Sequence, residues 1–138
     1  MRFIITQLRK ICYNKFGDRM DCIFCKIING DIPSYKIYED ETVYSFLDIN
    51  PKGVGHTLVI PKKHFKDLDD IDLDTLKHIN EVTKMLKKRI EERLNPDGIQ
   101  IVQNNGCLQE VKHYHTHIIP AYLTNKDMTV EEVYEILK

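Results

Sequence analysis

Apolar residues in the second half of the chain recur with a helical period. From Asp72 onward they return every three or four positions, which is typical of a helix that packs one face against a core. The stripe comprises Leu73, Leu76, Ile79, Val82, Leu86, Ile90 and Leu94. Asn95-Pro96-Asp97-Gly98 then supplies residues that end helices. We therefore predict one long helix between Asp72 and this turn.

Elsewhere the pattern favours strands, with two shorter helices near the ends. The predicted strands are IPSYKIYED, TVYSFLDI, GHTLVIP (residues 55–61), GIQIVQ and HYHTHIIPAY. CIFCKIIN, after a possible cap at Asp21 and before Gly30, reads as a short helix. Thr129 and Glu132 form a capping-box pattern, which predicts a final helix over 129–137. Strands joined by short turns favour an α+β fold, an antiparallel sheet of about five strands with helices on one face.

Length and charge narrow the possible functions. With 138 residues the chain is about one domain long, and no apolar run approaches the roughly 18–20 residues needed to cross a bilayer. The net charge of −1 gives no global field for binding nucleic acid. Residues 1–19, however, carry five basic side chains against Asp18 alone. We expect a basic extension over 1–19, a domain over 20–138 and a cytoplasmic protein. Organelle targeting is the alternative, but the extension lacks the usual serine.

Two of the four cysteines, Cys22 and Cys25, form a C-x-x-C pair. Without a clear signal peptide, an extracellular disulfide framework is not expected. Three interpretations stay open on the pair alone. It is a redox pair, half of a tetrahedral zinc site, or two cysteines that pack as small apolar groups.

The segment HYHTH carries three of the six histidines on alternate positions. In a strand, His113, His115 and His117 share one face. A zinc held by all three is disfavoured, because the outer Cα atoms would lie about 13 Å apart while zinc–ligand bonds measure about 2 Å. Histidines satisfied within a partly buried strand are a second possibility. Phosphate chemistry is the third, since one imidazole attacks phosphorus while its neighbours bind oxygens or orient it.

Several blocks in order carry a resemblance to a known family. DCIFCKIINGDIPSYKIYEDE, SFLDINPKGVGHTLVIPKKH, NNG and QEVKHYHTHIIP resemble the histidine triad superfamily. The similarity is to its Hint-type branch, particularly bacterial and protist-like members with an N-terminal C-x-x-C. It extends from about residue 21 to residue 122, so residues 20–138 would form a HIT domain. Its implied activity is hydrolysis or nucleotidyl transfer at the α-phosphate of purine nucleoside phosphoramidates.

The resemblance also implies a role for each histidine. His115 matches the nucleophile that forms a nucleotidyl-histidine, and His117 matches the member that contacts phosphate oxygens. His113 matches the member that orients the nucleophile. His56 matches an additional histidine hydrogen-bonded to the triad.

A nucleotide site is implied in the same way. Asp48 matches the carboxylate that binds ribose hydroxyls, while Asn104 and Gln109 match polar residues near the phosphate and leaving group. The matching apolar base pocket comprises Phe24, Ile27, Phe46, Leu47 and Ile49. The chain departs from the family in the loop NNGCLQ, which is about two residues shorter than usual. Glu110 stands where eukaryotic members have a serine, and Lys112 and Thr116 replace residues that are commonly apolar.

Finally, the resemblance implies a structural zinc and a homodimer. Cys22, Cys25, His64 and His113 match a closed set of two thiolates and two imidazoles. Such a zinc would connect the N-terminal helix to the histidine strand, and the sheet would continue across a dimer. Two other functions remain open: a dinucleoside polyphosphate hydrolase, or a nucleotide-binding interaction protein with little turnover. An intact set of histidines argues against the second.

Overall fold

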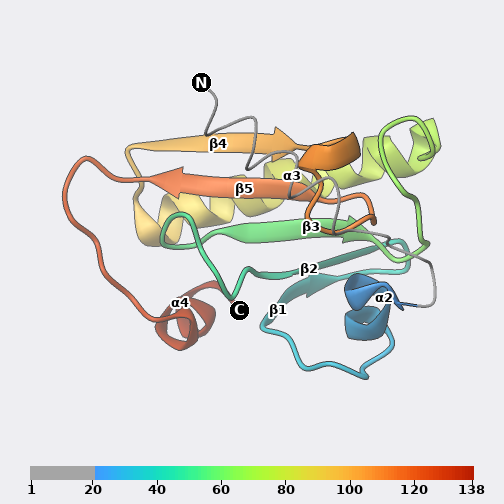
Figure 1. The fold of residues 1–138 in the computed structure, drawn as a ribbon. Helices are drawn as coiled ribbons and strands as arrows, with labels where there is room; N and C mark the ends of the chain where they lie inside the picture. The colour runs from blue at the N-terminus through green and yellow to red at the C-terminus, as the bar shows by residue number, and fades with distance from the viewer. Residues whose placement is uncertain (1–20) are drawn as a thin grey trace, which may run out of the picture.

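The computed structural model describes residues 21–138 and contains a five-stranded antiparallel sheet, as predicted (Figure 1). The strand order is β1-β2-β3-β5-β4. The strands are β1 Lys36–Glu39, β2 Val43–Leu47, β3 Thr57–Pro61, β4 Gly98–Gln103 and β5 Thr116–Ala121. The predicted extension over 1–19 lies outside the described residues. Among the described helices, none combines the length and apolar character of a membrane span.

The long helix α3 covers one face of the sheet (Figure 1). It runs Leu73–Leu94, within one residue of its predicted start, because the Asp72 side chain accepts a hydrogen bond from the Thr75 amide at 3.0 Å. Its buried stripe packs against alternate residues of the central strands, among them Val43, Leu47 and Val59. These residues form the first core cluster.

Helix α4, Val130–Leu137, packs beside α3 and has the predicted capping box of Thr129 and Glu132. Arg89 of α3 donates hydrogen bonds to the carbonyls of Leu137 at 3.2 Å and Ile37 at 3.3 Å. The guanidinium therefore connects the C-terminal end of α4 to β1. Its positive charge also interacts favourably with the negative end of the α4 dipole.

The short helix α2, Ile23–Ile28, lies on the opposite face of the sheet from α3, where we had expected all helices to share one face (Figure 1). Its N-cap is Cys22, in place of the predicted Asp21. Phe24 and Ile27 pack against Phe46, Leu58 and Ile60 in a second core cluster. Every residue of β2 and β3 is consequently buried, because each face has its own cover.

Strand β5 begins at Thr116, three residues later than the strand predicted from His113. The preceding segment follows a 3₁₀ turn, η2, at Gly106–Leu108. Its Tyr114 amide donates to the carbonyl of Phe65 at 2.7 Å, outside the sheet. His113 and His115 therefore lie beyond the ladder, and only His117 is part of it.

Candidate active site and metal cluster

His56 and His117 form a partly buried hydrogen-bonded pair. His117 in β5 lies opposite Leu58 in β3, and His56 directly precedes β3. His56 Nε2 lies 2.9 Å from His117 Nδ1. The Lys52 amide, which can only donate, lies 3.1 Å from His56 Nδ1. In a neutral His56 the proton is consequently on Nε2 and is donated to His117 Nδ1, which leaves the His117 proton on its Nε2.

The loop that supplies the Lys52 amide is held tightly against β5. A Cβ on Gly53 would lie 2.1 Å from the carbonyl oxygen of Pro120, so only glycine fits at this approach. Gly55 has a φ of +95°, a region that residues with a side chain rarely adopt. Both glycines fix the position of the amide that determines the tautomer of His56.

His115 is oriented by a backbone group. Its Nδ1 lies 2.7 Å from the carbonyl oxygen of His113, which can only accept, so Nδ1 carries the proton. The lone pair of the neutral ring is then on Nε2, the atom with which imidazole attacks phosphorus. Ring contacts with Phe24 at 5.2 Å and His117 at 4.8 Å, both edge-on, support this orientation.

Burial keeps the paired histidines neutral. It lowers the pKa of His117 to about 3, with further contributions from His115, His56 and Lys52. Burial also lowers the pKa of His56, although the charge of Asp48 opposes the change. Near pH 7 both rings are therefore neutral, as their hydrogen bonds require.

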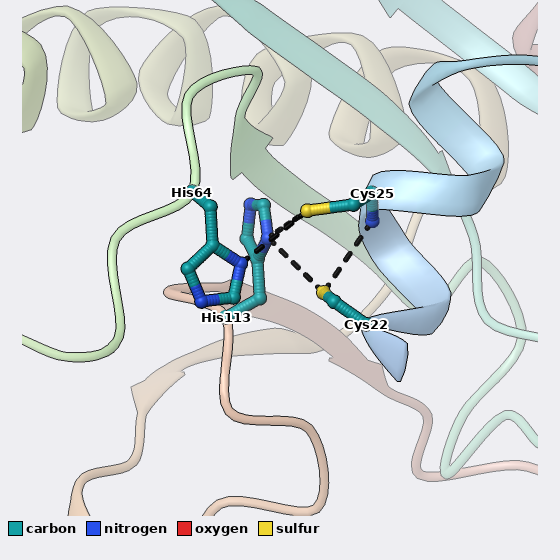
Figure 2. Close-up of side chains that lie close together, drawn as sticks. All are labelled: Cys22, Cys25, His64 and His113. Carbon is teal, nitrogen blue, oxygen red and sulfur yellow. Dashed lines mark hydrogen bonds between the residues drawn. The ribbon is translucent and has the colours of Figure 1, made fainter. Parts of the chain in front are cut away.

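The side chain of His113 belongs to a different cluster from the other two triad histidines. Its Nε2 donates to the Pro61 carbonyl at 2.8 Å, which leaves the lone pair on Nδ1. That nitrogen lies 3.4 Å from Cys22 Sγ and 3.5 Å from Cys25 Sγ (Figure 2). His64 Nδ1 lies 3.3 Å from Cys25 Sγ. The His113 ring still lies on the same side as His115, since both contact Phe24 edge-on, but the expectation that one strand carries all three histidines is wrong, because β5 begins at Thr116.

The donor atoms of these four residues fit a tetrahedral metal ion. With zinc–sulfur bonds of about 2.3 Å and zinc–nitrogen bonds of about 2.05 Å, tetrahedral angles give sulfur–nitrogen edges of about 3.5 Å. The observed edges of 3.3 to 3.5 Å match that value. Two thiol groups and two imidazoles also form a donor set typical of structural zinc. The sequence-predicted metal ligands are thus brought together (Figure 2).

A second group of possible ligands, Asp48, His56 and His117, does not fit a metal as well. Their ligand atoms lie within 4.8 Å of one another. Metal binding at His56 Nε2 would move its proton to Nδ1, where the Lys52 amide already donates. Two donors would then face each other. This geometry instead supports a hydrogen bond between the two histidines.

A cavity of about 310 Å³ opens beside the histidine pair. Two segments of chain line it together with His56 and His117. The first contributes Asp48, Asn50 and Lys52, and the second contributes Asn104, Leu108 and Glu110. Asp48 Oδ1 accepts from the Asn50 amide at 2.8 Å, while its Oδ2 lies 3.7 Å from His56 Nε2. The cavity therefore combines carboxylate, ammonium and imidazole groups at one place.

The other predicted nucleotide residues divide into those near the histidines and those away from them. Phe24, Ile27 and Phe46 lie together in the second core cluster, beside His115. Leu47 instead packs in the first core cluster, on the α3 face. Ile49 is 70% exposed. The alternation of side chains along β2 explains why Leu47 separates from Phe46.

Asn104 lines the cavity, whereas Gln109 does not. Gln109 is fully buried, and its Nε2 donates to the Lys66 carbonyl at 2.6 Å. Sequence reasoning missed the groups that fix the tautomers, the Lys52 amide and the Pro61 carbonyl, since backbone atoms carry no residue signal. The turn-forming run Asn50-Pro51-Lys52-Gly53 was the one sequence signal for the loop that carries the Lys52 amide.

Comparison with known proteins gives a consistent picture. A family model described as HIT domain matches residues 29–124. A HIT-like protein of Methanocaldococcus jannaschii is 53% identical over 105 residues, 73% of this chain and 79% of its own length. An adenosine 5′-monophosphoramidase of Candida albicans is 47% identical over 105 residues, 72% of this chain and 69% of its own length. A zinc-bound histidine triad protein of Mycobacterium smegmatis superposes with a TM-score of 0.79 and 39% identity, covering 86% of this chain and 91% of that one.

Proposed function

Because this chain belongs to the HIT domain family, we propose that it is a nucleotide hydrolase that cleaves purine nucleoside phosphoramidates at the α-phosphate. The observation that carries the proposal is the hydrogen bond from His115 Nδ1 to the His113 carbonyl, which leaves Nε2 as the nucleophilic atom. The Candida albicans relative, an adenosine 5′-monophosphoramidase, supports an AMP-type substrate.

In the proposed first step, His115 Nε2 attacks the α-phosphorus and the bond from phosphorus to the leaving nitrogen breaks. The leaving nitrogen takes a proton from the solvent, which the attacking water returns in the second step, so the amine departs and the nucleotide remains bonded to His115. The imidazole then carries positive charge, which the His113 carbonyl stabilises through the Nδ1 proton. Water attacks phosphorus in the second step and releases AMP and neutral His115. Splitting the reaction in this way is covalent catalysis.

His117 contacts the phosphate in both steps, and His56 supports it through their hydrogen bond. Because His56 donates to His117 Nδ1, His117 presents its Nε2 proton to a non-bridging oxygen. Their lowered pKa values keep both rings in this donor arrangement at pH 7. His56 touches no substrate in this scheme and acts through His117.

The nucleotide itself binds across the cavity and the second core cluster. Asp48 accepts hydrogen bonds from the ribose hydroxyls with its partly exposed carboxylate. In this proposal the base lies beside Phe24, Ile27 and Phe46, which are buried in the second core cluster next to His115. Asn104 contacts the phosphate or leaving group from the second segment of the cavity wall. Leu47 and Gln109 are buried away from the cavity, so they support these contacts without making them.

Cys22, Cys25, His64 and His113 hold a structural zinc ion in this proposal. A closed set of four protein ligands gives zinc a structural role, with no position for a reacting water. These residues would join α2, the loop after β3 and the segment before β5. The Mycobacterium smegmatis relative, described as zinc-bound, supports the assignment.

We also propose a homodimer whose sheet continues across the interface. Strand β4 is one of the two edges of the sheet, and among the described residues only β5 pairs with it. Three of its six residues are exposed, including Ile101 at 47%. An edge strand with exposed apolar residues is suited to pairing with a second copy.

The function is tested by following AMP release from adenosine 5′-phosphoramidate. The wild type should turn over, and His115→Ala should lose at least about 10³-fold in kcat because the nucleophile is gone. His78→Gln, on α3 and outside the site, serves as the matched control and should retain full activity. Mass spectrometry of the quenched wild type should detect a nucleotidyl adduct on His115. Equal turnover by the wild type and His115→Ala would contradict the mechanism.

A further inference from the structure

Glu110 enters the cavity because its neighbour Gln109 turns inward. The Gln109 side chain is buried against the Lys66 carbonyl. The backbone N–H of Gln109 donates to the Gly106 carbonyl at 3.1 Å. The Lys112 ammonium donates to the same Gly106 carbonyl, which closes the loop on itself. Neighbouring side chains in an extended segment point in opposite directions. Because Gln109 points into the core, Glu110 points into the cavity.

Glu110 and Lys52 are the charged side chains with no partner on the cavity wall. Among the described residues, neither the Glu110 carboxylate nor the Lys52 ammonium makes a side-chain hydrogen bond or ion pair. Both charges nevertheless act at the histidines. Beyond the effects of burial and Asp48, Lys52 lowers the pKa of His56 and Glu110 raises it. Each is therefore available to a bound substrate.

The two charges belong to different segments of the cavity wall. This suggests that they contact different parts of the substrate. Lys52 lies in the segment that carries Asp48, where the proposed function puts the ribose. Glu110 lies in the other segment, with Asn104 and Leu108. With the ribose at the first segment and the phosphate at His117, the leaving group extends along the second segment. Its substituents then meet a carboxylate.

We infer that Glu110 is a specificity-determining residue that favours leaving amines carrying a second, protonated amino group and disfavours anionic leaving groups. The inference rests on the proposed function, whose leaving group it specifies. A polyphosphate leaving group brings several negative charges towards Glu110, and like charges at close range suppress a wrong partner. Glu110 thereby also separates phosphoramidates from dinucleoside polyphosphates, the alternative substrate class.

Three matched phosphoramidates of AMP test the inference. Their leaving amines are 1,4-diaminobutane, butylamine and 4-aminobutanoate, which are similar in length and carry positive, no or negative charge at the far end. In the wild type, kcat/KM should be about 10- to 100-fold higher for the first than for the third. Glu110→Gln should reduce that ratio about tenfold, and Glu110→Lys should reverse it. Raising the salt concentration should shrink the wild-type ratio, because the carboxylate is exposed.

Glu41→Gln is the charge-matched control, because Glu41 is exposed in the β1–β2 turn, away from the cavity. It should leave the ratio unchanged, and an equal shift would overturn the inference by showing an effect of total charge. Hydrolysis of all three compounds with the same ratio in wild type and Glu110→Gln would overturn the inference while the proposed function stands. If the folded wild type hydrolysed none of them, the proposed function would fail and the inference with it.

Discussion

The backbone carbonyl of His113 accepts the Nδ1 proton of His115 at 2.7 Å, while the ring of His113 faces Cys22 and Cys25. One residue therefore belongs to two sites through different atoms. Its side chain is part of the four-residue metal cluster, and its main chain orients the candidate nucleophile. A change that moves the main chain of His113 therefore disturbs both sites.

Cys25→Ser should abolish zinc binding and lower both stability and turnover. The thiol of Cys25 lies near both histidines of the cluster, and serine is a poor zinc ligand. We expect a loss of roughly 2–5 kcal/mol in the free energy of unfolding and at least tenfold in kcat. Zinc content by atomic absorption, thermal denaturation and AMP release would be measured together. Lys26→Gln, the next and exposed residue of α2, is the control; if the two variants behaved alike, the cluster would have no role in stability.

Gly53→Ala should impair catalysis through the histidine pair. The added Cβ meets the Pro120 carbonyl at 2.1 Å, so the loop must move and carry the Lys52 amide away from His56. We expect kcat to fall about 10- to 100-fold and stability to fall by about 1–3 kcal/mol. Gly98→Ala provides the comparison, since nothing lies within 4 Å of a Cβ there. Unchanged kcat in Gly53→Ala would show that the amide does not govern His56.

His78→Gln should destabilise the protein in a pH-dependent way. His78 Nε2 lies 2.6 Å from Asp40 Oδ2, and this hydrogen bond raises the pKa of His78. Burial would raise the pKa of Asp40, but hydrogen bonds from His78, Thr42 and Tyr38 outweigh it and lower that pKa. The Asp40 carboxylate thus stabilises the folded state at pH values above its unfolded pKa near 4. The imidazolium contributes fully below its unfolded pKa near 6.5 and loses its contribution as pH rises through the folded value.

The cost of His78→Gln should therefore be greatest between about pH 4 and pH 6.5 and smaller at pH 9. Because the His78 side chain is 36% exposed, we expect only about 0.5–1 kcal/mol at pH 6. Urea unfolding at pH 6 and pH 9 measures the difference. A cost that grew with pH would contradict the assigned direction of the His78 pKa.

Arg89→Met should loosen α4. The guanidinium donates to the carbonyls of Leu137 and Ile37, and methionine keeps the apolar stem while removing both bonds. We expect a loss of about 1–2 kcal/mol in the free energy of unfolding and faster amide hydrogen exchange in α4. Lys88→Met, exposed on the same helix, should leave both measurements unchanged. Equal exchange rates in the two variants would argue against the role of Arg89.

The sequence predicted the strands, the long helix and the capping box because each has a local pattern of hydrophobicity or caps. The family resemblance also implied the four metal-cluster residues, which the structure brings together. The start of β5 could not be predicted, because HYHTH has the alternation of a strand but is held outside the ladder by a bond from Tyr114 to Phe65. That contact joins residues about fifty positions apart.

The candidate site shows the same division. Phe46 and Leu47 look equally suited to an apolar pocket, but strand alternation sends them to opposite core clusters. Gln109 and Glu110 are both polar, and only the path of the loop decides that Glu110 lines the cavity. The tautomers of three histidines depend on backbone groups at Lys52, Pro61 and His113. None of these relationships is a property of residue type.

The sheet separates two tasks that evolution can alter independently. The face covered by α3 contains the larger apolar cluster, while His56, His115, His117 and the four-residue cluster lie towards the α2 face or beside it. We expect substitutions in the α3 layer to change mainly the free energy of unfolding and, under the proposed function, substitutions in the loops at 48–52 and 104–110 to change mainly substrate recognition. A lineage could therefore acquire new substrates by exchanging two short loops while it inherits the other layer unchanged.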